Sequence, residues 1–193
     1  MKHHWLILVL VLAATAPLAN AVIVSATAVA ADPTVSVVDY LWDAQAESLF
    51  ITETVRGYPA TVLADFTTDP PVGDPRAWIR KRVDNNTDFG WAGYIIDLKM
   101  LDSFTIDSVT TMPNWTGVAT PVLPDGNGYF AATVDFTAAP GAYVPVGGTG
   151  QFNILVTFPG TAQFSINQTP VAPEPISLAL LAIGGLLIRR TRR

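Results

Sequence analysis

The sequence predicts an all-β protein whose main part is a single β-sandwich, of the immunoglobulin-like or jelly-roll type. Apolar residues recur with period two, and turn residues interrupt them at short intervals. Abundant β-branched residues and scattered prolines disfavour helices. The chain has 193 residues, and without its two apolar ends it has room for about one domain. We expect that domain over residues 32–170.

Two segments show the clearest alternation. Apolar and aromatic side chains occupy every second position of residues 129–136, and residues 151–158 repeat the pattern. Each is therefore expected to be a half-buried strand. The alternation continues through Phe164 and Ile166, after a turn at Pro159-Gly160. Further strands are expected at residues 34–42, 49–55, 60–66, 78–84, 94–101 and 104–111.

Residues 1–21 are expected to be a signal peptide. A short start with Lys2 precedes an apolar run over residues 5–14, which is too short to span a bilayer. Small residues follow, and Ala19-Asn20-Ala21 fits the pattern of a cleavage site. Ala28-Val29-Ala30 fits it nearly as well. We therefore expect cleavage after Ala21, or as late as residue 31.

Residues 171–193 form a tail of three parts. The first contains Pro173-Glu174-Pro175, whose prolines keep this segment extended and accessible. The second, residues 176–188, is apolar and uncharged, and is expected to be a short transmembrane helix of roughly 20 Å. The third part is an arginine cluster: Arg189, Arg190, Arg192 and Arg193. Arginines prefer the cytoplasmic face, which leaves the domain outside.

This order of Pro-Glu-Pro, apolar helix and terminal arginines resembles the PEP-CTERM sorting signal of Gram-negative and related bacteria. Ile176 departs from the Ser or Thr that often follows the second proline there. The resemblance implies processing by an exosortase, a membrane protease or transpeptidase. It also implies an exported protein, anchored in the membrane at least transiently and then located at the cell surface or outside the cell. Proteins with this tail commonly accompany exopolysaccharide production.

Charge and composition exclude several functions. Residues 32–170 contain 15 acidic and 6 basic residues, so this part repels phosphate backbones and no nucleic-acid partner is expected. The chain has no cysteine, which excludes disulfides and thiolate sites. The only histidines, His3 and His4, lie in the expected signal peptide, which excludes histidine-based triads and zinc sites in the mature protein. We expect no cofactor.

The favoured function is therefore non-enzymatic, at the cell surface or in the extracellular matrix, with polysaccharide as a candidate partner. The alternative is a carboxylate-dependent polysaccharide hydrolase or lyase, whose pair would come from Glu53, Asp97, Asp107 or Asp135. An exposed cleft with two carboxylates would favour the enzyme. A flat exposed aromatic strip would favour the binding protein.

Candidate glycan-binding residues are Trp78, Trp115 and Asn86. The two indole rings could stack on sugar rings, and the amide could bond to hydroxyl groups. Trp42 and Trp91 are expected instead to pack in the core, as most tryptophans of a small domain do.

Asp125 and Asn127 lie in a loop that ends in Gly128 and offer oxygen atoms to a cation. Their spacing resembles the start of a calcium-binding loop, but the later carboxylate of such a loop is missing. Asp-Gly and Asn-Gly pairs are also typical of a hairpin turn, which is the favoured interpretation.

Overall fold

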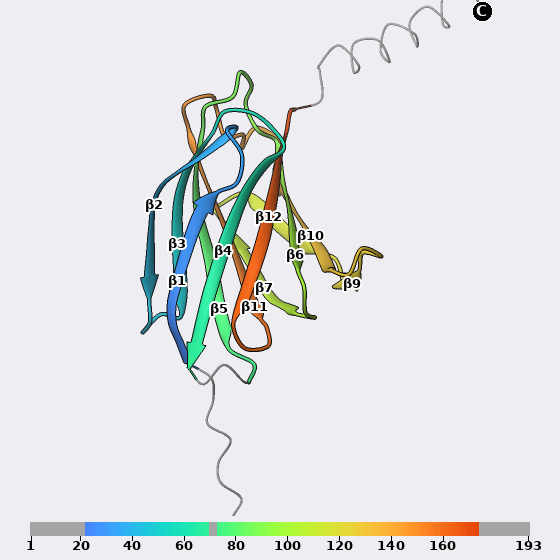
Figure 1. Cartoon of the computed structure of the whole chain (residues 1–193). Helices are drawn as coiled ribbons and strands as arrows, with labels where there is room; N and C mark the ends of the chain where they lie inside the picture. The colour runs from blue at the N-terminus through green and yellow to red at the C-terminus, as the bar shows by residue number, and fades with distance from the viewer. Residues whose placement is uncertain (1–21, 70–72, 174–193) are drawn as a thin grey trace, which may run out of the picture.

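The computed structural model describes residues 22–69 and 73–173. Within these ranges it contains twelve strands and no helix, which confirms the all-β prediction. The strands form two sheets that face each other, as in a β-sandwich (Figure 1). In the described ranges no helix is long and apolar enough to cross a membrane. The predicted signal peptide, the predicted helix 176–188 and the terminal arginines lie outside the described residues.

The larger sheet has seven strands, and all its pairs are antiparallel. Across the sheet the order is β1 (Val22–Ala30), β4 (Ala60–Asp69), β12 (Ala162–Val171), β6 (Gly93–Met100), β10 (Phe130–Ala138) and β8 (Trp115–Ala119), with β9 (Leu123–Pro124) paired to β10.

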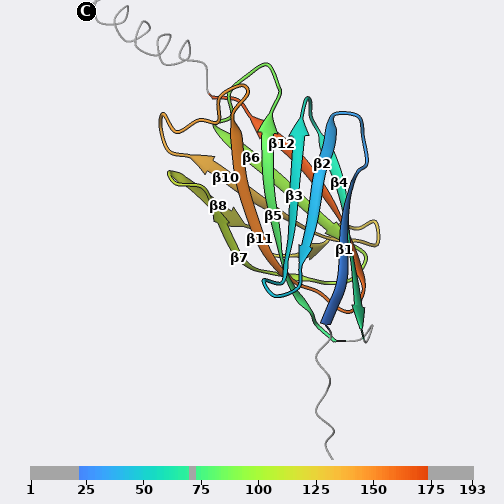
Figure 2. The same cartoon turned by 90° about the vertical axis from the view of Figure 1, so that its left-hand side faces the viewer.

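The smaller sheet has five strands and lies in front of the larger one in Figure 2. Its order is β2 (Val35–Asp43), β3 (Ser48–Val55), β5 (Arg76–Asn85), β11 (Thr149–Thr157) and β7 (Thr105–Thr111). Only its β3–β5 pair is parallel. Nine of these twelve strands overlap segments in which the sequence pattern predicts a strand.

The core lies between the sheets, where alternate side chains of each strand meet. Buried and more exposed positions alternate along β10 and β12, as the period-two pattern predicts. Aromatic rings fill the centre. The rings of Tyr94 and Phe152 stack with centroids 4.4 Å apart, and Phe66 contacts both Phe158 and Phe164. The contact of Tyr94 on β6 with Phe152 on β11 joins strands of the two sheets, so this packing couples them.

Strand β1 covers Val22–Ala30, so residues ahead of the predicted domain start at Asp32 take part in the larger sheet. Strand β1 pairs with β4 and buries Ile23, Ala26 and Ala28. A run of valine, alanine and serine is typical of a cleavage region, but it also suits an edge strand, and sequence pattern alone does not separate the two. Strands β8 and β9 were also missed, because they are short.

A turn around Asp32 leads from β1 to β2. The Asp32 carboxylate accepts hydrogen bonds from the backbone N–H of Thr34, at 2.9 Å, and of Thr61. Burial acts to raise the pKa of Asp32, but the hydrogen bonds from Thr34 and Thr61 outweigh it and hold the pKa below its ordinary value. This turn therefore links β1 and β2 to the start of β4.

Candidate functional site

Strand β5 displays a basic stripe on the outer face of the five-stranded sheet. Alternate residues of a strand point to one side, and here they are Arg76, Trp78, Arg80 and Arg82, all half-buried or exposed. Arg76 pairs with Asp107 at 3.2 Å. Among the described residues, no salt bridge engages Arg80 or Arg82. Two arginines are thus available on the surface of an otherwise acidic domain.

Arg80 lies against two aromatic rings. Its guanidinium carbon is 4.8 Å from the ring centroid of Trp78 and 5.7 Å from that of Phe50. Its Nε donates a hydrogen bond to the Ser48 hydroxyl at 3.0 Å. The parallel register places Phe50 opposite Arg80 and Ser48 opposite Trp78, so neighbouring strands supply the four side chains. Cation–π contacts and the hydrogen bond fix the orientation of the guanidinium.

A shallow hollow of about 280 Å³ adjoins this arginine. Phe50, 40% exposed, and Arg82 line one side of it, and Gln151 and Asn153 on β11 line the other. The Asn153 amide donates to the Thr110 hydroxyl at 3.2 Å. We call this surface the Arg80 face; it comprises Phe50, Trp78, Arg80, Arg82, Gln151 and Asn153. Ring faces, guanidinium groups and amides together suit a sugar, and the arginines suit its acidic groups.

The three residues predicted to bind glycan do not come together. Trp78 belongs to the Arg80 face, but Trp115 is only 7% exposed and its Nε1 donates to the Ala142 carbonyl at 2.6 Å. Its ring packs edge-on against Phe152, so including Trp115 in an exposed platform was wrong. Asn86 is exposed just after β5, roughly 26 Å along the strand from Trp78 at 3.3 Å per residue.

Two further tryptophans, Trp91 and Trp42, pack within the sandwich. Trp91 is fully buried and its Nε1 donates to the Thr87 hydroxyl at 3.0 Å, which confirms the prediction that it packs in the core. Trp42 is half-buried, with its ring edge-on to Phe66. Neither ring is presented as a flat surface for a ligand.

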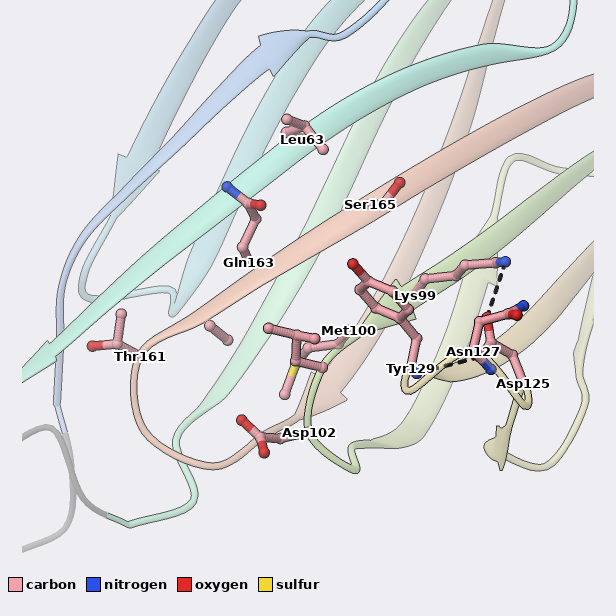
Figure 3. Close-up of a pocket in the computed structure, with 12 residues that line it drawn as sticks. Leu63, Lys99, Met100, Asp102, Asp125, Asn127, Tyr129, Thr161, Gln163 and Ser165 are labelled. Atoms are coloured by element: carbon pink, nitrogen blue, oxygen red, sulfur yellow. Dashed lines mark hydrogen bonds and ion pairs between the residues drawn. The ribbon is translucent and has the colours of Figure 1, made fainter.

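A second hollow, of about 530 Å³, lies on the outer side of the seven-stranded sheet (Figure 3). Strands β4, β6 and β12 form its floor, and the loop between β9 and β10 forms a wall. The Lys99 ammonium and the Asp125 carboxylate meet there at 3.3 Å, and the Tyr129 ring lies nearby. Asp102 also lines the hollow, apart from that pair (Figure 3). This hollow therefore contains two carboxylates.

The loop at Asp125 is the turn of the β9–β10 hairpin, which confirms the favoured interpretation. Asp125 Oδ1 accepts from the backbone N–H of Asn127 at 2.8 Å and of Tyr129 at 3.2 Å. The hydrogen bond from Asn127, followed by those from Tyr129 and Lys99, lowers the pKa of Asp125 below its ordinary value against the opposing effect of desolvation. Among the described residues, no group of three or more His, Cys, Asp or Glu could hold a metal ion.

No family model, curated protein or solved structure matches this chain. Its ligands must therefore be inferred from its own side chains.

The four carboxylates from which the sequence analysis drew a catalytic pair do not form one group: Glu53 and Asp107 lie apart, whereas Asp97 and Asp135 share the outer face of the adjacent strands β6 and β10. Glu53 is buried between the sheets, where it contacts Lys81. Asp97 accepts from the Thr133 hydroxyl at 2.6 Å within the seven-stranded sheet, which also carries Asp135. Asp107 lies on β7, in the other sheet. Neither Asp97 nor Asp107 lies in the hollow of Figure 3, whose carboxylates, Asp102 and Asp125, come from loops that the sequence analysis did not propose as catalytic.

Proposed function

We propose that this chain is an exported, non-enzymatic protein of the cell surface or extracellular matrix. Its C-terminal tail directs sorting by an exosortase-type enzyme, and its domain associates with extracellular polysaccharide through the Arg80 face. Acidic sugars are the preferred ligands.

The sorting part of the proposal rests on the tail and on where β12 ends. Strand β12 ends at Val171, two residues before the first proline of the Pro-Glu-Pro motif. The strand reaches the upper end of the domain in Figure 1, whereas β1 starts at the lower end. A tail that enters the membrane after residue 175 would therefore hold the domain by one end, with both sheet faces free in the extracellular space.

The binding part rests on one observation, the contact of Arg80 with Trp78 and Phe50 beside a hollow lined by amides. Aromatic faces stack on the C–H groups of sugar rings, and amides bond to hydroxyl groups. Guanidinium groups form paired hydrogen bonds with carboxylates or sulfates. An isolated basic surface on an acidic domain also attracts polyanions locally while the rest of the molecule repels them.

Within this proposal the sandwich is a jelly-roll rather than an immunoglobulin-like fold. From β4 to β7, and again from β10 to β12, successive strands alternate between the two sheets. The orders β4-β12-β6-β10 and β5-β11-β7 correspond to a double-sheet jelly-roll with β1, β2 and β3 added at one side. Lectin domains share this architecture, but fold alone does not assign a ligand.

A glycan-binding screen tests the proposal. The exported protein is compared with Trp78→Ala and Arg82→Ala variants on neutral and acidic polysaccharides at two salt concentrations. Both variants should bind acidic polysaccharide at least tenfold more weakly, and salt should weaken binding of the unaltered protein. Tyr143→Ala is the matched control, because Tyr143 is also an exposed aromatic residue but lies outside the Arg80 face. Equal binding by all variants would refute a role for this face.

The hollow in Figure 3 favours a second candidate function, the carboxylate-dependent hydrolase or lyase, because it contains Asp102 and Asp125. In this candidate Asp102 is the general acid or base, since three donors engage Asp125. New reducing ends or unsaturated products would appear on incubation with polysaccharide and disappear in Asp102→Asn. Persistence of the products in that variant would contradict this candidate function.

A further inference from the structure

Four polar side chains meet in the interior, between the two sheets. Glu53 on β3 and Lys81 on β5 come from one sheet, and Tyr94 on β6 and Gln168 on β12 come from the other. Lys81 is 2% exposed and the other three are fully buried. Of these four residues, sequence reasoning singled out only Glu53 as a candidate catalytic carboxylate.

One carboxylate oxygen connects the cluster. Glu53 Oε2 accepts from the Lys81 ammonium at 3.0 Å and from the Gln168 side-chain N–H at 3.4 Å. The Tyr94 hydroxyl donates to the Gln168 carbonyl oxygen at 2.7 Å. Glu53 Oε1 is buried and has no hydrogen-bond partner in the described structure. An amine and an amide are thus held on the same carboxylate oxygen.

Such an arrangement is unfavourable as a permanent ion pair. Removing two charges from water costs several kcal/mol for each ion, and the unpartnered Oε1 adds to that cost. Burial lowers the pKa of Lys81, although the charge and hydrogen bond of Glu53 act to raise it. Lys81 therefore loses its proton more readily than a lysine at the surface does, and the neutral amine that results is a nucleophile.

The amide is polarised at the same time. Burial, and secondly the charge of Glu53, raise the pKa of Tyr94 well above its ordinary value, so its hydroxyl stays protonated. It can therefore stabilise negative charge on the carbonyl oxygen of Gln168, as an oxyanion-hole donor does. A nucleophile, a base and an electrophile with its stabilising donor are all present.

We propose that Lys81 and Gln168 form an intramolecular amide bond in the folded protein, with Glu53 as proton carrier and Tyr94 as stabiliser of the oxyanion. The modification joins Lys81 Nζ to Gln168 Cδ and releases ammonia. It needs no oxidant, cofactor or external enzyme.

The atoms and charges balance as follows. Glu53 takes a proton from the Lys81 ammonium, and the neutral Nζ attacks Cδ of Gln168, moving an electron pair onto the carbonyl oxygen bonded to Tyr94. In the tetrahedral intermediate Nε2 is an amine, so Glu53 donates its proton to Nε2 and takes another from Nζ. The carbonyl re-forms, the Cδ–Nε2 bond breaks and ammonia leaves. Glu53 ends protonated, so no ionic charge remains in this cluster.

The bond would cross-link the two sheets covalently in a chain that has no cysteine and so cannot form a disulfide. It would join β5 to β12 only three residues before β12 ends at Val171. Any pull exerted through the C-terminal tail would then pass into both sheets rather than peel β12 away. This inference does not depend on the glycan-binding proposal, and its test is separate.

Intact-mass measurement of the purified exported protein tests the inference, after its actual termini have been identified. The mass should be lower than the sequence mass by one ammonia, and tandem mass spectrometry of a digest should find a peptide containing Lys81 linked to one containing Gln168. Glu53→Gln, Lys81→Met and Gln168→Met should each have the full sequence mass. The full mass in the unaltered protein would overturn the inference, whether or not these variants fold.

Matched control variants exclude other sources of the ammonia loss. Gln163→Met and Lys99→Met change an exposed glutamine on the same strand and an exposed lysine, and both should keep the ammonia loss. Asn127→Ala should also keep it, because a cyclic imide at Asn127-Gly128 would otherwise give the same mass change. Loss of one water instead would identify Glu53 as the acyl donor and overturn the assignment to Gln168. Abolition of the loss by Asn127→Ala would overturn the amide bond altogether.

Discussion

Truncating Ile23 tests whether β1 is part of the folded domain. The side chain is 5% exposed, and Ile23→Ala removes three carbon atoms from it. At about 0.8 kcal/mol per buried carbon, the unfolding free energy should fall by about 2.4 kcal/mol. The cavity left by the side chain should add little to this loss, because an edge strand can relax into it. With a urea m-value of about 2 kcal/mol/M, the midpoint should shift by about 1 M. The assay is equilibrium urea unfolding of protein that begins at Val22.

The neighbouring residue supplies the control. Val24 lies on the same strand but is 54% exposed, so Val24→Ala should change the unfolding free energy by no more than about 0.5 kcal/mol. Equal midpoints for Ile23→Ala, Val24→Ala and the unaltered protein would mean that β1 does not pack on the core. The domain would then begin near Asp32, and signal cleavage near residue 31 would remove nothing essential.

Three further predictions concern other parts of the chain. Gly117→Ala should destabilise the domain by about 1–3 kcal/mol in thermal or urea unfolding, because a Cβ there would lie 2.4 Å from Val109 Cγ1; Gly57→Ala, with its nearest neighbour at 3.4 Å, should be nearly neutral. Asp32→Asn should be less stable than the unaltered protein at neutral pH. Because the folded pKa of Asp32 is lowered, this difference should disappear in unfolding experiments as the pH falls from about 4 through that pKa. Glu174→Ala should leave membrane insertion intact but prevent removal of the tail, which mass spectrometry of the C-terminus would detect; a trimmed C-terminus in this variant would contradict the sorting proposal.

The period-two pattern of apolar residues predicted the strands in which nearly every second side chain is buried in the core. Strand β10 alternates between buried and more exposed positions, and β11 does so except at Leu155, because their inward side chains meet the opposite sheet. Strand β1 escaped prediction because it lies at the edge and its inward residues include the small Ala26 and Ala28, which give a weak signal. Short strands such as β9 have too few residues to show any period.

The candidate site was only partly predictable, for a different reason. Trp78 could be singled out as an aromatic residue, but Phe50, the other ring that contacts Arg80, is 28 positions before Trp78 in the sequence and comes beside Arg80 only through the parallel β3–β5 register. The same register directs Glu53 toward Lys81. The sequence also does not show that Trp115 is buried whereas Trp78 lies on the outer face, because burial depends on which side of each strand faces the core. Tertiary pairing, rather than residue type, decides these positions.

The position of β12 predicts that the proposed removal of the tail would leave the described strands intact. This strand lies between β4 and β6, and its pairing with β6 continues to Val171. The Val171 carbonyl also accepts a hydrogen bond from the Ala92 N–H at 2.8 Å, so the backbone is engaged up to that residue. The first segment that a processing enzyme could bind in extended form therefore begins at about Ala172, directly before Pro173. Cleavage at the Pro-Glu-Pro motif would remove none of the described strands, whereas cleavage of the N-terminus near residue 31 would remove β1 and expose the edge of β4.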